Sequence, residues 1–168
     1  MIAALTGLRR GEILALRWSD IDLEKRFIYV RQNIVMGVID TPKSNTSRRV
    51  VGISDKLHAA LLNLQLSAPE GSEFIFLIKK EGNLYDAPHI SRIQFHKAIK
   101  AAGITKKIRF HDLRHSFATL LKNQGVHRND IQGVVGHSSA TVTDIYMHLM
   151  PEIYSKIAST AEDAIFSE

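Results

Sequence analysis

The sequence contains no cysteine, an absence that excludes disulfide scaffolds, thiolate metal sites and cysteine nucleophiles. This absence also fits a reducing cytosol. No apolar run approaches the length needed to cross a membrane. The apolar stretch Met1–Leu5 is too short for a signal peptide and has no basic leader. We therefore expect a cytoplasmic protein without a membrane partner.

What the chain does contain is enough apolar material for a core and an excess of positive charge. Its 168 residues suit one domain, and 45% of them are apolar. Lys and Arg number 22 against 17 Asp and Glu, which gives a net charge of +5. This balance favours an anionic partner, and nucleic acid is the first candidate. Charge alone leaves open a basic protein with no such partner.

The first third of the chain predicts short helices followed by strands. After a first helical stretch, apolar residues at helical spacing predict a helix from about Arg10 to Trp18, which residues 19–22 end. Three runs rich in Val, Ile, Phe and Tyr then predict strands. These runs are Phe27–Val30, Val35–Asp40 and Arg49–Ile53, with a polar hairpin turn at residues 43–47 before the last. A small three-stranded antiparallel sheet is the expected result.

The remainder of the chain predicts helices. Ser54 stands where it could cap a helix running through Leu57 to Leu64. The clearest helix runs from His111 to Gln124 and ends at Gly125, and a shorter one over Arg128–Val135 ends at Gly136. Helical pieces also surround residue 146 and follow residue 151. The expected class is α+β, mainly helical with a small sheet.

The helix that begins at His111 carries one candidate site. Helical spacing places His111, Arg114 and His115 on one face, opposite an apolar face made of Leu113, Phe117, Leu120 and Leu121. A histidine beside a guanidinium suits a phosphate, because Arg binds it as a fork and His can donate or move a proton. An ordinary polar surface helix is the alternative. Zinc is disfavoured, since an arginine lies between the two histidines and no Glu follows the first.

Tyr146, nine residues after His137, is a candidate nucleophile. A tyrosine hydroxyl has a reference pKa near 10 and needs help to react. Nearby positive groups would favour the phenolate if Arg9, Arg114, His111 and His137 converge on it. The alternative is a packed tyrosine whose hydroxyl is tied to a partner.

Two further cations lie at turns. Arg9 follows Thr6-Gly7 and precedes an apolar helix, where the helix dipole is mildly unfavourable for a cation. That placement slightly favours a functional role for Arg9 over a solvated side chain without one. Lys43, in the expected hairpin turn and followed by Arg48-Arg49, could reach a groove or a leaving group. A solvated charged turn is the simpler interpretation of this segment taken alone.

Taken together, these pieces resemble the tyrosine recombinase (phage integrase) family. The resemblance rests on the order and spacing of Thr6–Arg9, Pro42-Lys43, His111–His115, Gly136-His137 and Tyr146. It covers nearly the whole chain, from Thr6 to about Met147. It implies that residues 1–168 are the family's catalytic domain and that the activity is site-specific DNA recombination. Integration or excision of a mobile element or prophage is the expected role.

The resemblance also implies a mechanism. Tyr146 would attack the scissile phosphate, leaving a 3′-phosphotyrosine and a free 5′-hydroxyl. Lys43 would protonate the leaving 5′-oxygen as general acid, and His111 would assist proton transfer at the tyrosine. Neither a metal nor a nucleotide cofactor is required by this scheme.

Three more residues are implied to bind the phosphate. Arg9 and Arg114 would clamp its non-bridging oxygens, where charge builds up in the transition state. His137 resembles the family's phosphate-binding histidine. With Tyr146, Lys43 and His111, these residues complete the predicted catalytic set.

The implied partners are double-stranded DNA and other recombinase protomers, assembled as a tetramer on DNA. The C-terminal segment, with Ile153, Ile157, Ala161 and Ile165 at helical spacing, is expected either to pack on a neighbouring protomer or on its own domain. We expect a domain that is shortened at its N-terminus and lacks the family's separate core-binding domain. Such a chain should bind DNA weakly and mostly through phosphates. A DNA-binding remnant without catalysis and a type IB topoisomerase remain the alternatives.

Overall fold

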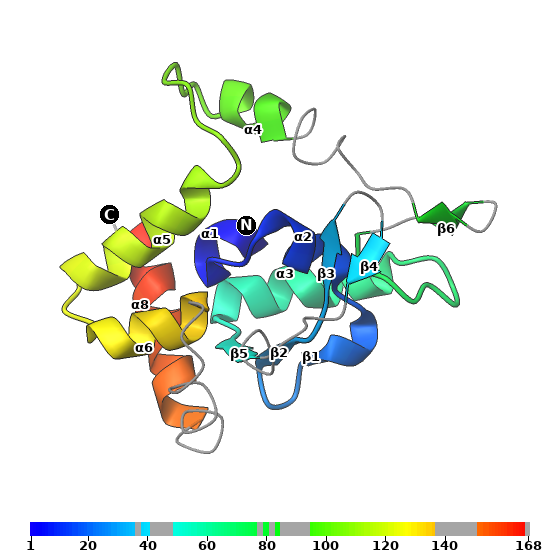
Figure 1. Cartoon of the computed structure of the whole chain (residues 1–168), viewed down its shortest axis with the longest axis horizontal. Coiled ribbons are helices and arrows are strands. Elements are labelled where there is room, and N and C mark those ends of the chain that lie inside the picture. The colour runs from blue at the N-terminus through cyan, green and yellow to red at the C-terminus, as the bar shows by residue number, and fades with distance from the viewer. Residues whose placement is uncertain are drawn as a thin grey trace.

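The computed structural model describes residues 1–35, 38–40, 49–76, 79–80, 83–84, 95–136 and 151–166 (Figure 1). Helices and short strands alternate in the first half, and helices dominate the second. The described helices are α1 (Ile2–Thr6), α2 (Arg10–Ala15), the 3₁₀ turn η1 (Trp18–Asp20), α3 (Asp55–Leu66), α4 (Phe95–Ala101), α5 (Asp112–Asn123), α6 (Arg128–Val135) and α8 (Pro151–Phe166). The described strands are β1 (Ile21–Asp22), β2 (Phe27–Val30), β3 (Asn33–Val35), β4 (Val38–Asp40), β5 (Arg49–Gly52), β6 (Lys79–Lys80) and β7 (Asn83–Leu84).

A three-stranded antiparallel sheet is present, but its membership differs from the prediction. The strand order is β1-β2-β5, with Phe27 opposite Gly52 and Val30 opposite Arg49. The predicted strand Val35–Asp40 is wrong, because β3 and β4 pair with each other in a separate hairpin. The buried Ile34 of β3 packs against α2 and not beside the sheet. The predicted turn at residues 43–47 lies outside the described residues.

The second helix is shorter than predicted. It ends at Ala15, and the backbone then pairs with a distant segment instead of continuing as a helix to Trp18. The Trp18 amide donates to the Glu73 carbonyl, and the Ile75 amide donates to the Leu16 carbonyl. These long-range hydrogen bonds take the place of helical ones, so Leu16 and Arg17 are extended before η1 begins at Trp18.

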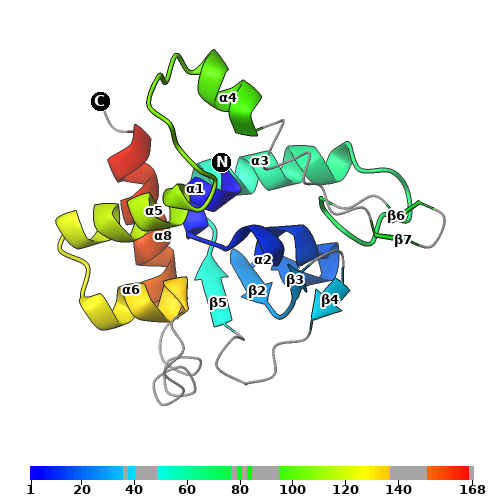
Figure 2. The ribbon, with the colours of Figure 1, turned by 45° about the horizontal axis from the view of Figure 1, so that its top comes forward.

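The core lies where the sheet meets the C-terminal helices. Ile28 of β2, Leu121 of α5 and Ala161 of α8 are fully buried in one cluster. Figure 2 shows α5, α6 and α8 on one side of α1, with β2, β3 and β4 on the other and β5 between the groups. Strand β5 approaches α8 so closely that a Cβ at Gly52 would lie 2.3 Å from the Tyr154 carbonyl oxygen.

The predicted helices that correspond to α3, α5, α6 and α8 are confirmed, with one change at a cap, whereas the helical piece expected around residue 146 lies outside the described residues. Helix α5 begins after His111 and ends before Gly125, and α6 runs from Arg128 to Val135. Helix α3 begins after Ser54 as predicted, but the Ser54 hydroxyl is buried and has no hydrogen-bond partner among the described residues. Ser54 therefore occupies the cap position without acting as a side-chain cap.

Helix α8 packs on its own domain. Ile157, Ala158 and Ala161 are buried against α5 and β5, whereas Ile165 and Phe166 at the end of the helix are 37% and 42% exposed. Of the two predicted alternatives for this segment, packing within the domain accounts for its buried face. Within the part of the chain that the structure describes, no helix is both long and apolar enough to span a membrane.

Candidate active site

Arg9 is positioned by the junction between α1 and α2. Gly7 ends α1 in the left-handed conformation, with φ of 63°, and turns the chain toward Arg9. Arg9 is the N-cap of α2, and its backbone amide donates to Glu12 Oε2 at 2.7 Å. Its guanidinium also contacts Glu12, with Nη1 2.9 Å from Oε1, and the side chain stays 44% exposed. Glu12 therefore offsets the unfavourable position of a cation at a helix N-terminus.

Arg114 lies on the buried face of α5, which corrects the predicted helix orientation. It shares this face with Phe117 and Leu121 and is only 7% exposed, whereas His111 is exposed. The predicted shared polar face of His111 and Arg114 is therefore wrong. Burial of Arg114 is possible because its Nη1 donates to the Gly7 carbonyl at 2.8 Å and so does not lack a partner.

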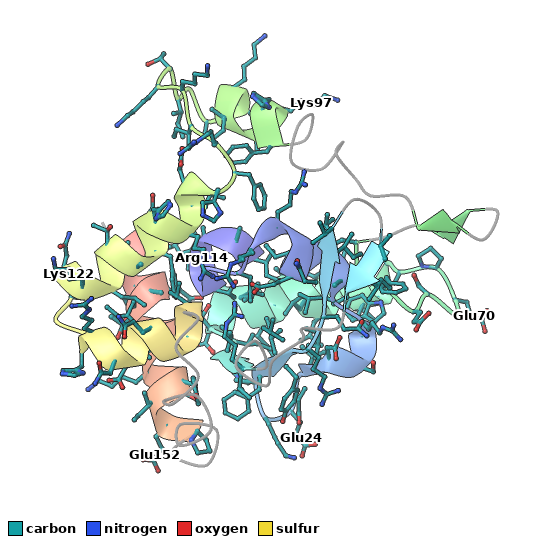
Figure 3. The ribbon with its side chains drawn as sticks, in the orientation of Figure 1. Glu24, Glu70, Lys97, Arg114, Lys122 and Glu152 are labelled. Atoms are coloured by element: carbon teal, nitrogen blue, oxygen red, sulfur yellow. The ribbon has the colours of Figure 1, made fainter. Side chains whose placement is uncertain are left out.

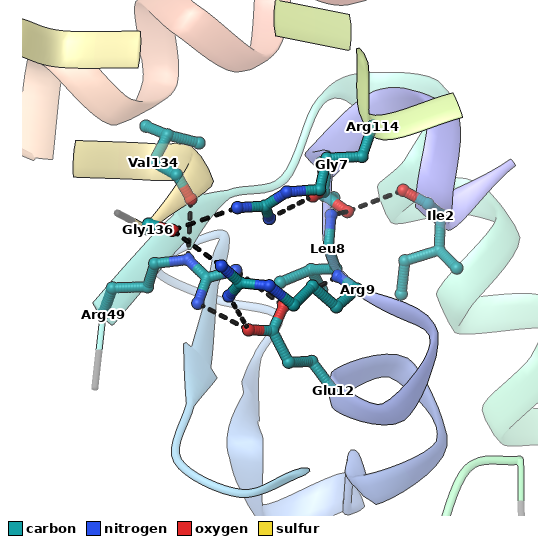
Figure 4. A network of polar contacts seen from close by, with 10 residues as sticks. Ile2, Gly7, Leu8, Arg9, Glu12, Arg49, Arg114, Val134 and Gly136 are labelled. Carbon is teal, nitrogen blue, oxygen red and sulfur yellow. Dashed lines mark hydrogen bonds and ion pairs between the residues drawn. The ribbon is translucent and has the colours of Figure 1, made fainter. Parts of the chain in front are cut away.

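The two arginines converge on one carbonyl oxygen (Figure 4). Arg9 Nη2 donates to the Gly136 carbonyl at 2.9 Å, and Arg114 Nη2 donates to the same oxygen at 3.0 Å. Gly136 follows the last residue of α6, so both cations also lie at the negative end of that helix dipole. Burial, together with the charges of Arg9 and Arg49, lowers the pKa of Arg114 to about 10. The guanidinium still carries its charge at neutral pH.

A buried carboxylate and a third arginine support this pair. Arg49, at the start of β5, is 3% exposed and binds Glu12 as a fork, with Nη1 2.9 Å from Oε1 and Nη2 2.7 Å from Oε2. Burial by itself would raise the pKa of Glu12, but hydrogen bonds and charges from Arg49 and Arg9 outweigh it and lower the pKa to about 2. Glu12 is therefore ionised and balances one of three neighbouring positive charges.

Sequence reasoning missed Arg49. The charged turn before the last predicted strand, with Arg48-Arg49 at its end, favours solvated side chains, and no local pattern links Arg49 to Glu12. One signal was available: in a strand, alternate residues share a face, so Arg49 lies on the same side of β5 as the buried Val51. That pattern indicates a buried Arg49 but does not identify its partner.

His111 lies at the other end of the site. It is the N-cap of α5, one turn before Arg114, and its ring meets that of His115 edge to face at a centroid distance of 4.9 Å. Desolvation lowers the pKa of His111, and the charges of His115 and Arg114 lower it further. The neutral imidazole, which can accept a proton, is therefore favoured at neutral pH.

The remaining predicted catalytic residues, Lys43, His137 and Tyr146, lie outside the described residues. The carbonyl held by Arg9 and Arg114 belongs to Gly136, whose peptide bond leads into residue 137. The described ranges contain no group of three or more His, Cys, Asp or Glu side chains placed to hold a metal ion.

A strongly basic segment precedes α5, the helix that carries Arg114. Residues 95–109 contain no acid and five Lys or Arg residues, all exposed: Lys97, Lys100, Lys106, Lys107 and Arg109. An edge-to-face contact between Phe95 and Phe110, at 5.4 Å, ties α4 to the start of α5. Figure 3 shows Lys97 beside α4, above and apart from Arg114.

Comparison with known proteins gives consistent matches. Residues 1–152 match the phage integrase family. The chain is 30% identical over 189 residues to a tyrosine recombinase XerC-like protein of Caldanaerobacter subterraneus subsp. tengcongensis, covering 97% of this chain and 48% of that protein. It is 35% identical over 180 residues to the ICEBs1 integrase of Bacillus subtilis, covering 98% of this chain and 48% of that protein. The chain thus spans about half the length of these curated relatives.

Solved structures agree with the fold. The crystal structure of XerA recombinase superposes with a TM-score of 0.64 at 29% identity, covering 99% of this chain and 56% of that one. The Tn1549 transposon integrase, in complex with a circular intermediate DNA, superposes with a TM-score of 0.68 at 25% identity, covering 88% of this chain and 52% of that one. The predicted class, mainly helical with a small antiparallel sheet, is confirmed.

Proposed function

This chain belongs to the phage integrase family, and from that premise we propose that it is the catalytic domain of a site-specific DNA recombinase. The proposed reaction cleaves and rejoins DNA strands through a 3′-phosphotyrosyl intermediate. Integration or excision of a mobile element or prophage is the proposed role, in keeping with relatives that include the ICEBs1 integrase and the Tn1549 transposon integrase.

The observation that carries this proposal is the convergence of Arg9 and Arg114 on the Gly136 carbonyl. Two guanidiniums held this close together suit a phosphodiester, whose two non-bridging oxygens gain negative charge in the transition state. Both side chains are already anchored, Arg9 by Glu12 and Arg114 by Gly7. Little reorganisation is therefore needed when a phosphate enters, which is the condition for efficient electrostatic catalysis.

In the proposed reaction, the Tyr146 oxygen attacks the scissile phosphorus while the bond from phosphorus to the 5′-oxygen breaks. His111, with its lowered pKa, accepts the tyrosine proton, and Lys43 protonates the leaving 5′-oxygen. His137 joins Arg9 and Arg114 in binding the phosphate. A 5′-hydroxyl from a second duplex then attacks the phosphotyrosine, which reverses these steps and joins the strands.

The proposed partner is double-stranded DNA. The basic segment at residues 95–109 offers exposed cations to the phosphate backbone. A second proposed partner is other protomers of the same protein, in a tetramer on DNA. Strand exchange requires two duplexes, and a tetramer supplies one active site for each of their four strands.

Covalent trapping tests the proposed function. The full-length protein is incubated with a pool of nicked duplexes of random sequence, and adducts that survive denaturation are isolated and sequenced. We expect wild-type protein to form adducts that share a site, Tyr146→Phe to form none, and Tyr29→Phe, which alters a β2 tyrosine, to behave as wild type. An adduct that persists in Tyr146→Phe would refute the assigned nucleophile. Duplex binding without any adduct would indicate a DNA-binding protein without catalysis.

A further inference from the structure

Arg49 is a buried cation that the proposed chemistry does not use. Its side chain is only 2% exposed, yet it lies at the edge of the sheet, on a strand that carries none of the predicted catalytic residues. Three of its nitrogens have partners: Nη1 and Nη2 bind Glu12, and Nε donates to the Val134 carbonyl at 2.7 Å. One side chain thus joins β5 to the start of α2 and to the end of α6.

Both partners of Arg49 lead directly to the arginine pair. Glu12 accepts hydrogen bonds from the backbone amide and the guanidinium of Arg9. Val134 lies two residues before Gly136, whose carbonyl accepts from Arg9 and Arg114. The contacts therefore close a ring that runs from Arg9 through Glu12, Arg49 and the end of α6 back to Arg9 (Figure 4).

Steric contact strengthens the same connection. Gly136 has φ of 76°, and a Cβ built there would lie 3.0 Å from Arg49 Nη1. The guanidinium of Arg49 thus packs against the very peptide whose carbonyl holds the pair. Gly136 cannot shift toward the Arg49 guanidinium unless that side chain moves.

Stability alone does not account for this arrangement. A buried ion pair is weak evidence for stability, because an apolar pair of similar size is often equally stable or more so. The fork instead restricts geometry: the planar guanidinium meets both carboxylate oxygens while a third nitrogen meets a carbonyl on another element.

We propose that Arg49 is a positioning residue for DNA cleavage. Through its bonds to Glu12 and to the Val134 carbonyl, it fixes the position of Arg9 relative to Gly136. It does not touch the DNA. The inference rests on the proposed function, because it assigns Arg49 a role in the step that Arg9 is proposed to catalyse.

Arg49→Lys is the informative substitution. It keeps the positive charge beside Glu12, but its single nitrogen cannot reproduce the fork and the bond to the Val134 carbonyl together. Arg26→Lys is the matched control, because Arg26 lies beside the same sheet, is 44% exposed and pairs with Asp55 at the surface.

The experiment is a double-mutant cycle in the full-length protein, on a duplex recovered by covalent trapping. We expect Arg49→Lys to slow single-turnover adduct formation about 10- to 100-fold, as misplacement of a catalytic group does, with duplex affinity within about threefold of wild type. Arg26→Lys should change neither quantity. In an Arg9→Ala background, Arg49→Lys should slow the residual reaction by less than about twofold, because residues that act through one another are not additive.

Three results would overturn the inference. The first is an equal slowing by Arg49→Lys with and without Arg9. The second is a loss of duplex affinity at an unchanged rate, and the third is a rate equal to that of Arg26→Lys. Thermal unfolding checks that each variant is folded at the assay temperature. If Arg49→Lys is not folded, Arg49→Gln replaces it in the same cycle. Absence of any wild-type adduct would instead refute the proposed function, and this inference with it.

Discussion

Gly7 combines a left-handed backbone conformation with a direct contact to the active-site residue Arg114. It adopts φ of 63°, and a Cβ built on it would lie 2.5 Å from Cδ1 of the buried Phe117. Its carbonyl accepts the hydrogen bond from Arg114 Nη1. A side chain here would therefore strain the backbone, collide with α5 and shift the anchor of Arg114.

Gly7→Ala should destabilise the protein more than Gly103→Ala does. Both glycines have positive φ, but a Cβ at Gly103 meets nothing within 4 Å. We expect Gly103→Ala to cost about 1–2 kcal/mol for the left-handed backbone alone, and Gly7→Ala to cost about 1–3 kcal/mol more for overpacking. Chemical denaturation measures both. Equal losses would mean that the Phe117 ring moves aside without cost.

The lowered pKa of Glu12 predicts that the stability of the folded protein depends on pH. Its pKa is lowered to about 2 in the folded protein, against a usual value of 4.5. The stabilisation by the ionised Glu12 carboxylate is therefore complete above pH 4.5. It is lost as the pH falls toward 2, because the unfolded chain takes up the proton more readily than the folded protein. Unfolding free energies measured across this range should decline by about 3 kcal/mol from this group. The decline should shrink in Glu12→Gln, and an unchanged decline would contradict the assignment.

At the scale of elements, α8 shows how one helix closes the core. Its inner face lies on α5 and on β5, the strand that carries Arg49. The helix also contacts α3, where the Glu162 carboxylate accepts from the Lys56 amide at 2.7 Å. Helix α8 therefore packs against β5, the edge strand that bears Arg49.

Two isoleucines of α8 separate its inner and outer faces. Ile157→Ala should lower the free energy of unfolding by about 2–5 kcal/mol, because Ile157 is 4% exposed and its removal leaves a cavity. Ile165→Ala, at a residue that is 37% exposed, should change it by less than about 0.5 kcal/mol. Equilibrium unfolding measures both. If the loss for Ile165→Ala instead grows with protein concentration, a second copy covers this face.

At the scale of the whole molecule, positive charge is unevenly placed. The chain carries a net charge of +5, and residues 95–109 alone contribute five Lys or Arg and no acid. These residues project from the domain with α4, as Figures 1 and 2 show. Such a segment suits long-range attraction to a polyanion, with little dependence on its sequence.

The salt dependence of DNA binding tests this segment. In the full-length protein, replacing Lys106 and Lys107 by Ala should reduce the slope of log K against log salt by about 2, because each lost phosphate contact removes about 0.9. Lys25→Ala is the control, since Lys25 is an exposed lysine between β1 and β2, outside the basic segment. Fluorescence anisotropy at several salt concentrations measures the slopes. An unchanged slope would remove the basic segment from the DNA interface.

Local patterns in the sequence were sufficient for several elements and for part of the site. Helices α5 and α6 were predicted because their apolar periodicity is strong and each is followed by a glycine. The motifs around Arg9 and Arg114 identified both arginines, since residue type and spacing are local properties. The presence of a three-stranded antiparallel sheet was predicted, although one of its strands was misassigned.

Tertiary structure alone decided which faces are buried and which distant groups meet. Periodicity groups residues on one face but does not say that Arg114 lies inside, because carbonyls of Gly7 and Gly136 compensate its burial. In the same way, Arg49 is buried only because Glu12, 37 residues away in the chain, supplies a carboxylate. Long-range hydrogen bonds of this kind outweigh local preference, since a buried charge without a partner costs more than any propensity provides.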